Sequence, residues 1–204
     1  MSIKEIVWRG ENGPESLSSR LGSYSFSDSE GVAQMYAQIP NERTHSHEAT
    51  HCFLIKAEIE IQNPVFNIPS DPMIDFSDLV EKMGEEAATQ IFLDHQQHVM
   101  NTCAWSDEFY GKYKDVAELI EKSPTDVWQL CVNVYPLLDC KETVQKFKEA
   151  GFDGAVHAGN ALSMDTVEYK VFDKSQIRII EKLDMEFPDF KRPLVKPPSH
   201  QFNH

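Results

Sequence analysis

The side chains best suited to chemistry lie in three short stretches, and their types together indicate a site for a nucleotide. Arg9 ends a predicted strand and can grip a phosphate with two parallel hydrogen bonds. In the next strand, 24–27, aromatic rings alternate with hydroxyls, so Ser25 and Ser27 point the same way. Glu168 adds a carboxylate far along the chain. Arginine for phosphate, rings for a flat base, hydroxyls for ribose and a carboxylate for a developing cation would serve a reaction at a glycosidic bond.

Glu168 stands at the mouth of a predicted strand, directly after a small polar loop at 159–166. The strand alternates, with Val167, Tyr169 and Val171 on one face and Glu168 on the other. A carboxylate in this place is held by the strand and stays within reach of a ligand. An ordinary solvent-exposed strand glutamate is the alternative interpretation, because most strand glutamates are solvated.

Other common site motifs do not occur in the sequence. It has no glycine-rich phosphate loop, no Gly-x-Ser-x-Gly and no His-Glu-x-x-His. Three histidines in a polar loop, His45, His47 and His51, invite a zinc interpretation, but their spacing fits neither a hydrolytic zinc site nor a finger. We therefore predict no metal. Four cysteines without Cys-x-x-Cys spacing indicate reduced thiols and a cytoplasmic protein: Cys52, Cys103, Cys131 and Cys140.

Composition limits the choice of partners. The chain has 204 residues, enough for one domain or for one domain with an insertion. Its formal charge of -14 opposes direct binding to nucleic acid and suits a basic protein partner. No apolar run is long enough to span a membrane, and the first residues lack the apolar core of a signal peptide. We therefore expect no membrane partner.

The hydrophobic periodicity predicts strands at both ends of the chain and helices between them. Predicted strands cover residues 3–8, 24–27, 52–62, 155–157, 167–172 and 177–180. Predicted helices cover 30–38, several segments between 74 and 128, and 143–150, while 128–135 is either the end of the helical block or a separate helix. This order indicates an α+β domain over 1–180 with a helical insertion at about 74–130. Residues 181–204 are rich in proline and predict a C-terminal extension.

Four of these stretches, in this order, resemble the motifs of the ADP-ribosyltransferase superfamily. Trp8-Arg9-Gly10 and the segment 24–37 are similar to its first two motifs. The strand that ends in Asn63-Pro64 is similar to one found in phage-type and polyvalent-protein members. Residues 151–154 and 168–177 are similar to the closing signature. The likeness covers both ends of the chain and leaves the middle helices unmatched.

This resemblance implies a split β-sheet that binds NAD, as co-substrate, in a cleft. By analogy, Arg9 would hold the pyrophosphate or the adenine ribose, and the backbone of Gly10 would meet the nicotinamide amide. One of three aromatic residues would stack on the nicotinamide ring: Tyr24, Phe26 or Tyr36.

The resemblance also implies the catalytic residues. Ser25 or Ser27 would orient Glu168, and Glu168 would bind the nicotinamide ribose. A fixed carboxylate there would stabilise the positive charge that develops on the ribose at the transition state. Glu168, Arg9 and Ser25 are therefore the predicted catalytic set, in a mono-ADP-ribosyltransferase that modifies a protein target, one that a phage could direct at a host protein.

One departure from the family pattern leaves alternatives open. Arginine-directed members have a second glutamate two places before the catalytic one, where this chain has Thr166, so arginine is a doubtful acceptor. Water as the acceptor would make the protein an NAD glycohydrolase. A third alternative is a non-catalytic acidic protein that binds and inhibits a basic partner. The helical insertion is the predicted surface for recognising a protein target.

Overall fold

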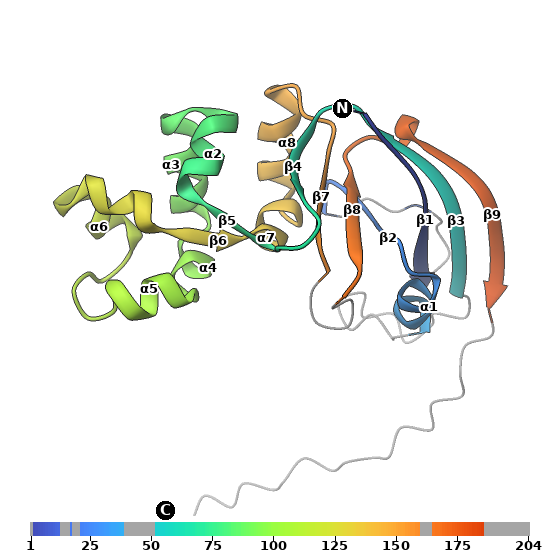
Figure 1. The fold of residues 1–204 in the computed structure, drawn as a ribbon, viewed down its shortest axis with the longest axis horizontal. Coiled ribbons are helices and arrows are strands. Elements are labelled where there is room, and N and C mark those ends of the chain that lie inside the picture. Colours follow the sequence, from blue (N-terminus) through green and yellow to red (C-terminus); the bar gives the residue numbers. More distant parts are fainter. Residues whose placement is uncertain (1, 13–16, 18–20, 39–51, 160–164, 186–204) are drawn as a thin grey trace, which may run out of the picture.

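A curved β-sheet forms one side of the molecule and a lobe of helices forms the other (Figure 1). The computed structural model describes residues 2–12, 17, 21–38, 52–159 and 165–185. The protein is thus of the mixed α+β class, as predicted. Within the described residues, no helix has the length and apolar character needed to cross a lipid bilayer.

The described strands of the main sheet number seven and stand in the order β4-β7-β8-β2-β1-β3-β9. The β4–β7 pair is parallel, and the other neighbours are antiparallel. Segments far apart in sequence thus become neighbours at the centre of the sheet. The strand bounds are β1 (Ile3–Asn12), β2 (Tyr24–Ser27), β3 (Cys52–Ile61), β4 (Pro64–Ile68), β7 (Gly154–Ala158), β8 (Val167–Val171) and β9 (Ile177–Met185).

The sheet has an apolar face and a polar face, because successive side chains of a strand point to opposite sides. The apolar face carries a buried cluster that includes Val7, Phe26, Ile55, Val156 and Val171. We call the opposite side of β2, β7 and β8 the polar face, defined by Ser25, Ser27, His157, Glu168 and Lys170. The predicted alternation of residues 167–171 is therefore confirmed, with Val167, Tyr169 and Val171 at the apolar cluster.

Helix α1 (Glu30–Gln38) follows β2 with the predicted bounds. Ser29 begins it, because the Ser29 hydroxyl accepts a hydrogen bond from the Val32 amide at 3.3 Å and so satisfies a free N–H of the first turn. Ala33 and Ala37 face β1 and are buried. Their small side chains let the helix approach the strand closely, at Gly10.

The helical lobe has its own large core, which also contacts the sheet. Phe76 and Phe92 pack edge to face, with ring centroids 5.2 Å apart. The same cluster includes Val65, Ala155 and Phe172 from the sheet, so the two parts share one apolar interior. The elements are β5 (Met73–Asp75), α2 (Phe76–Met83), α3 (Glu85–Asp94), α4 (Gln96–Met100), α5 (Cys103–Glu108), α6 (Val116–Lys122), η2 (Pro124–Gln129), β6 (Cys131–Asn133), α7 (Val134–Leu138) and α8 (Lys141–Glu149).

Several predicted strands or boundaries are wrong. The first strand does not end at residue 8, because β1 continues to Asn12 along β3, and β4 and β5 lie where no strand was predicted. Residues 131–133 form β6, which pairs with β5 through Ile74 and Val132 and closes the base of the lobe. The last strand does not stop at residue 180, because β9 continues to Met185 along β3. Arg178 bonds Glu58 at 2.9 Å in this edge pair, and Lys182 lies 3.7 Å from the centre of the Phe53 ring. Such cross-strand contacts can hold a charged edge strand that has little apolar periodicity.

Candidate functional site

Three neighbouring strands bring together the motifs that lie far apart in the sequence. Across β1, β2 and β8, Trp8 pairs with Ser27 and Ser27 pairs with Glu168. On the next strand, β7, His157 pairs with Glu168. Residues in register on antiparallel strands point to the same face, so Trp8, Ser27, Glu168 and His157 form one row on the polar face.

Glu168 is a buried carboxylate at the start of β8, with only 7% of the residue exposed. The alternative of an ordinary solvated strand glutamate is therefore wrong. The mouth of the strand is tied to the turn before α1, since the Val167 amide donates to an Asp28 carboxylate oxygen at 3.0 Å. The Asp28 amide returns a bond to the Val167 carbonyl at 3.1 Å. These two bonds fix the backbone beside Glu168.

The two serines of β2 have different surroundings. Ser27 is the direct cross-strand neighbour of Glu168, and its hydroxyl oxygen accepts a bond from the Ser29 amide at 3.1 Å. Ser25 lies opposite Lys170, whose ammonium donates to the Ser25 hydroxyl at 2.8 Å. Of the two residues predicted to orient Glu168, Ser27 is therefore the better placed.

The Arg9 side chain points to the apolar face of the sheet, whereas the Glu168 side chain points to the polar face. Its guanidinium lies 5.8 Å from the centre of the Phe26 ring. It donates to the Ser25 carbonyl at 2.9 Å and to the carboxylate of Glu11, which is itself buried. The only described Cα pairing between β1 and β2 is Trp8 with Ser27. Beyond this pair, the hydrogen bond from the Arg9 side chain to the Ser25 carbonyl joins the two strands. The structure does not bring the Arg9 and Glu168 side chains to one face.

The remaining predicted NAD-contacting residues divide into buried and accessible ones. Phe26 is 2% exposed inside the apolar cluster, so its ring belongs to the core and does not face a ligand. Tyr24 packs partly against the same cluster. Tyr36 stands on α1 with 42% of its surface exposed. Gly10 lies under α1, because a β-carbon there would stand 1.8 Å from the Ala33 carbonyl oxygen.

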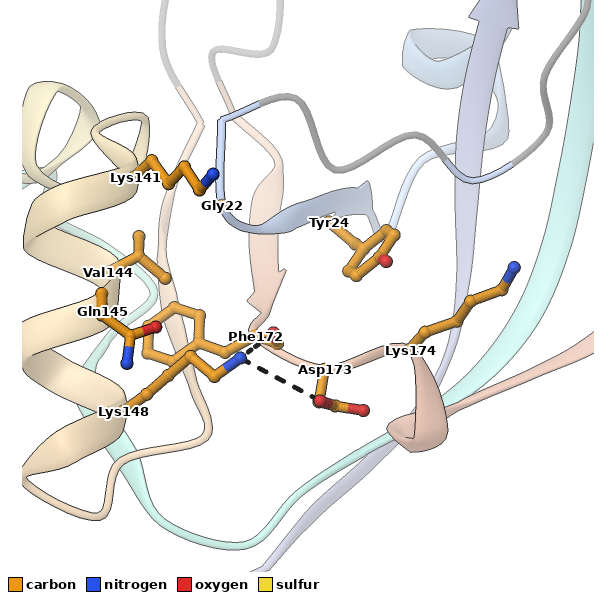
Figure 2. Close-up of a pocket in the computed structure, with 9 residues that line it drawn as sticks. All are labelled: Gly22, Tyr24, Lys141, Val144, Gln145, Lys148, Phe172, Asp173 and Lys174. Carbon is orange, nitrogen blue, oxygen red and sulfur yellow. Dashed lines mark hydrogen bonds and ion pairs between the residues drawn. The ribbon is translucent and has the colours of Figure 1, made fainter.

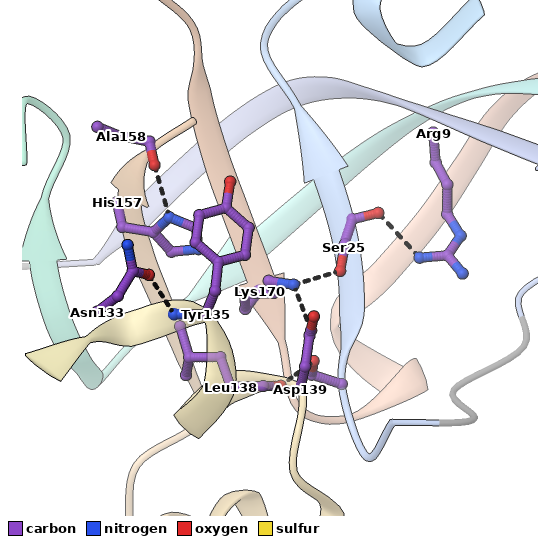
Figure 3. Close-up of polar contacts among 10 residues, drawn as sticks. Arg9, Ser25, Asn133, Tyr135, Leu138, Asp139, His157, Ala158 and Lys170 are labelled. Carbon is purple, nitrogen blue, oxygen red and sulfur yellow. Dashed lines mark hydrogen bonds and ion pairs between the residues drawn. The ribbon is translucent and has the colours of Figure 1, made fainter. Parts of the chain in front are cut away.

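The polar face also holds a cation that sequence reasoning did not single out. Lys170 is buried, and its ammonium bonds Asp139 at 2.8 Å as well as the Ser25 hydroxyl (Figure 3). It lies 5.4 Å from the centre of the Tyr135 ring. The signal was present, since Lys170 is two places after Glu168 and so shares its face. For Asp139 and Tyr135, which come from the helical side, no sequence pattern indicates that they lie at this face.

His157 is the second polar residue that sequence reasoning missed. It is fully buried within the short strand β7, and its Nδ1 lies 2.8 Å from the Ala158 carbonyl (Figure 3). Among the described residues its Nε2 has no hydrogen-bond partner. The Tyr135 ring packs edge-on against it, with centroids 4.7 Å apart. Burial lowers the pKa of His157 below its ordinary value of 6.5, so the imidazole is neutral at neutral pH.

The histidines considered for zinc, His45, His47 and His51, lie outside the described residues. Within the described part of the chain, no group of three or more histidine, cysteine, aspartate or glutamate side chains is arranged to hold a metal ion.

Comparison with known proteins found no match: no family model, no curated protein and no solved structure is similar to the chain.

Proposed function

We propose that this chain is an NAD-dependent mono-ADP-ribosyltransferase that modifies a protein, on a split-sheet fold of the ADP-ribosyltransferase type. One observation carries the proposal. The register Trp8–Ser27–Glu168 brings residues from three of the sequence motifs onto adjacent strands and one face of the sheet, and this supports the proposal although Arg9 lies on the other face. The buried Glu168 carboxylate and the neighbouring Ser27 hydroxyl suit the nicotinamide ribose, whose hydroxyls can donate to the one and accept from the other.

In the proposed reaction, the bond between the nicotinamide nitrogen and C1′ of the ribose breaks. Its electron pair leaves with nicotinamide, and a nucleophile of the target protein attacks C1′ and loses a proton. Glu168 stabilises the cationic ribose that forms in between, and its low exposure strengthens that effect because little water screens the charge. Ser27 and the bonds between Asp28 and Val167 keep the carboxylate in position.

The role of Arg9 in this proposal is changed by its surroundings. Its guanidinium already donates hydrogen bonds to the Glu11 carboxylate and the Ser25 carbonyl, and it would have to break both to bind a pyrophosphate. We therefore assign Arg9 first to holding β1 against β2, and so to positioning Ser27 beside Glu168. Tyr36 is the most exposed of the three predicted stacking residues and is the proposed platform for the nicotinamide ring.

The target is proposed to be a basic protein that docks on the helical lobe. The formal charge of -14 favours such a partner through long-range attraction. Thr166 in place of an acidic residue argues for an acceptor other than arginine.

The test uses labelled NAD and Glu168→Gln, which keeps the shape of the side chain and removes its charge. We expect the wild-type chain to label a protein in a cell lysate and the variant to label it at least roughly 100-fold more slowly. Glu60→Gln, on an exposed strand position of β3, is the matched control and should keep full activity. Equal labelling by the Glu168 variant would refute the catalytic assignment.

The same assay separates the alternatives. Nicotinamide release without any acceptor protein would identify an NAD glycohydrolase. No release and no labelling, with binding to a basic partner that persists in the Glu168 variant, would identify a non-catalytic binding protein. Salt-sensitive binding would support that last outcome.

A further inference from the structure

A pocket lies at the far end of β8 from Glu168, between α8 and the start of β2. It has a volume of about 440 Å³. Its walls come from α8 on one side and from Gly22, Tyr24 and the short helix η4 (Lys174–Gln176) on the other (Figure 2). Gly22 adopts a φ of +86°, and a β-carbon there would be 3.0 Å from Cα of Lys141. The two walls therefore meet closely at one end of the pocket.

The lining of this pocket is cationic, although the whole chain is strongly acidic. Among the described residues, Lys141, Lys148 and Lys174 line it together with a single carboxylate, Asp173. In the whole chain, by contrast, 33 acidic residues outnumber 19 lysines and arginines. A local excess of positive charge within an acidic protein is the arrangement expected of a site for an anion.

Most of this positive charge is not neutralised by neighbours. Within the described residues neither Lys141 nor Lys174 forms a salt bridge. Lys148 lies 4.0 Å from Asp173 and donates to the Phe172 carbonyl at 3.3 Å, which holds its ammonium at the pocket. Lys141 and Lys148 both extend from α8 toward the opposite wall (Figure 2).

We infer that this pocket binds the phosphate of a small organic phosphate, with the Tyr24 ring beside the ligand's flat group. Ammonium groups on flexible stems are common ligands of phosphate. An aromatic lining residue favours a nucleotide over a simple sugar phosphate. The site is separate from Glu168, because Phe172 comes four positions after Glu168, a distance of roughly 13 Å along an extended strand. The inference does not depend on the proposed transferase activity.

Nuclear magnetic resonance of the full chain can test this with AMP and adenosine as probes at low ionic strength. We expect AMP to shift the amide signals of Gly22, Tyr24 and Gln145, and adenosine to shift them far less. Salt should weaken AMP binding. Signals that move around Ser27 and Glu168 instead, equal binding of adenosine, or no change at millimolar AMP would each overturn the inference.

A double variant, Lys141→Gln with Lys148→Gln, tests the cationic lining. We expect it to weaken AMP binding at least roughly tenfold, which corresponds to about 1.4 kcal/mol. The matched control is Lys112→Gln with Lys114→Gln, which removes the same charge from exposed positions of the helical lobe and should leave AMP affinity nearly unchanged. An equal loss in both double variants would mean that only general electrostatic attraction is at work. Glu168→Gln should still bind AMP, whether or not the transferase proposal holds.

Discussion

At the scale of single residues, the strand start at Glu168 is held to a segment far away in the sequence. Its strand partner Ser27 comes from a segment 141 positions earlier, and the reciprocal bonds between Asp28 and Val167 hold the two segments together. Gly10 has a comparable role on the next strand, because its missing side chain lets α1 rest on β1. The resemblance assigned Gly10 to a ligand, but packing alone requires a glycine there.

Gly10→Ala should therefore destabilise the fold. The new β-carbon would stand 1.8 Å from the Ala33 carbonyl oxygen and 2.5 Å from the Ala37 nitrogen, which are backbone atoms that cannot turn away. Overpacking of this kind costs roughly 1–3 kcal/mol or more. The midpoint of urea unfolding measures the loss.

Gly31→Ala is the matched control for this substitution. The nearest atom to its new β-carbon would be the Ser29 hydroxyl oxygen at 3.9 Å, so nothing is displaced. Removing glycine from the exposed side of α1 should stabilise the protein by about 0.5–1 kcal/mol. A Gly10→Ala protein as stable as the wild type would show that α1 does not rest on β1 in this way.

At the scale of elements, α7 attaches the helical side of the molecule to the polar face of the sheet. Asp139, directly after α7, bonds Lys170 of β8, and Tyr135 packs against His157 of β7. The Leu138 carbonyl accepts a bond from the Ser23 hydroxyl at 2.9 Å. The lobe and the sheet also share one apolar core, so deleting residues 74–128 would uncover part of the sheet. Target recognition is therefore better tested by surface substitutions, for example at Tyr110, which is 80% exposed.

Substitution of Asp139 and substitution of Lys170 should lower the free energy of unfolding by different amounts. The Lys170 side chain is 3% exposed and that of Asp139 is 32% exposed. Asp139→Asn leaves a buried ammonium without its counter-charge, and we expect it to cost roughly 2–4 kcal/mol. Lys170→Met leaves a carboxylate that water can still reach, so its cost should be smaller.

Unfolding of both single variants and the double variant gives the coupling energy of this pair. A coupling of about 0.5–3 kcal/mol is expected for residues in direct contact. Lys122 and Glu118, an i,i+4 pair on α6 in which the lysine side chain is 60% exposed, form the control and should couple by only about 0.3–0.5 kcal/mol. Additive losses at Asp139 and Lys170 would mean that the pair does not hold α7 to the sheet.

At the scale of the whole molecule, two buried histidines couple stability to pH. Burial lowers the pKa of both His157 and His95 below their ordinary value of 6.5. The unfolded chain binds these protons near pH 6.5, whereas the folded chain binds them only at lower pH. Between those values the unfolded state carries more protons, so acidification favours unfolding.

The free energy of unfolding should therefore fall as pH is lowered from about 7, by up to about 1.4 kcal/mol per pH unit for each histidine. His157→Gln should reduce this slope, even if it also lowers stability at every pH. His98→Gln, at an exposed position of α4, should reduce the slope less than His157→Gln does, because His98 acts only through its charge on the pKa of neighbouring His95. A slope in the His157 variant equal to that of the wild type would contradict the assignment. Urea unfolding at a series of pH values provides the measurement.

Local patterns predicted much of the secondary structure. The alternation in 24–27 and 167–172 gave strands with correctly assigned faces, and α1 was predicted to the residue because Ser29 and the spacing of its apolar residues mark its bounds. The ends of β1 and β9 were missed, and so were the strands β4, β5 and β6. β6 is only three residues long, and β9 is a charged edge strand held by contacts with β3.

The sequence by itself determined most of the helices and the longer strands, and which side chains of a strand share a face, since both follow from local periodicity. Only the tertiary structure decided that Ser27, and not Ser25, lies beside Glu168, and that Arg9 turns to the opposite face. It also decided that Lys170 forms an ion pair with Asp139, and that Lys141, Lys148 and Lys174 line one pocket. Strand order and register depend on pairings such as Ser27 with Glu168 and Ile59 with Ile177, which join residues more than a hundred positions apart, and no local pattern encodes those contacts.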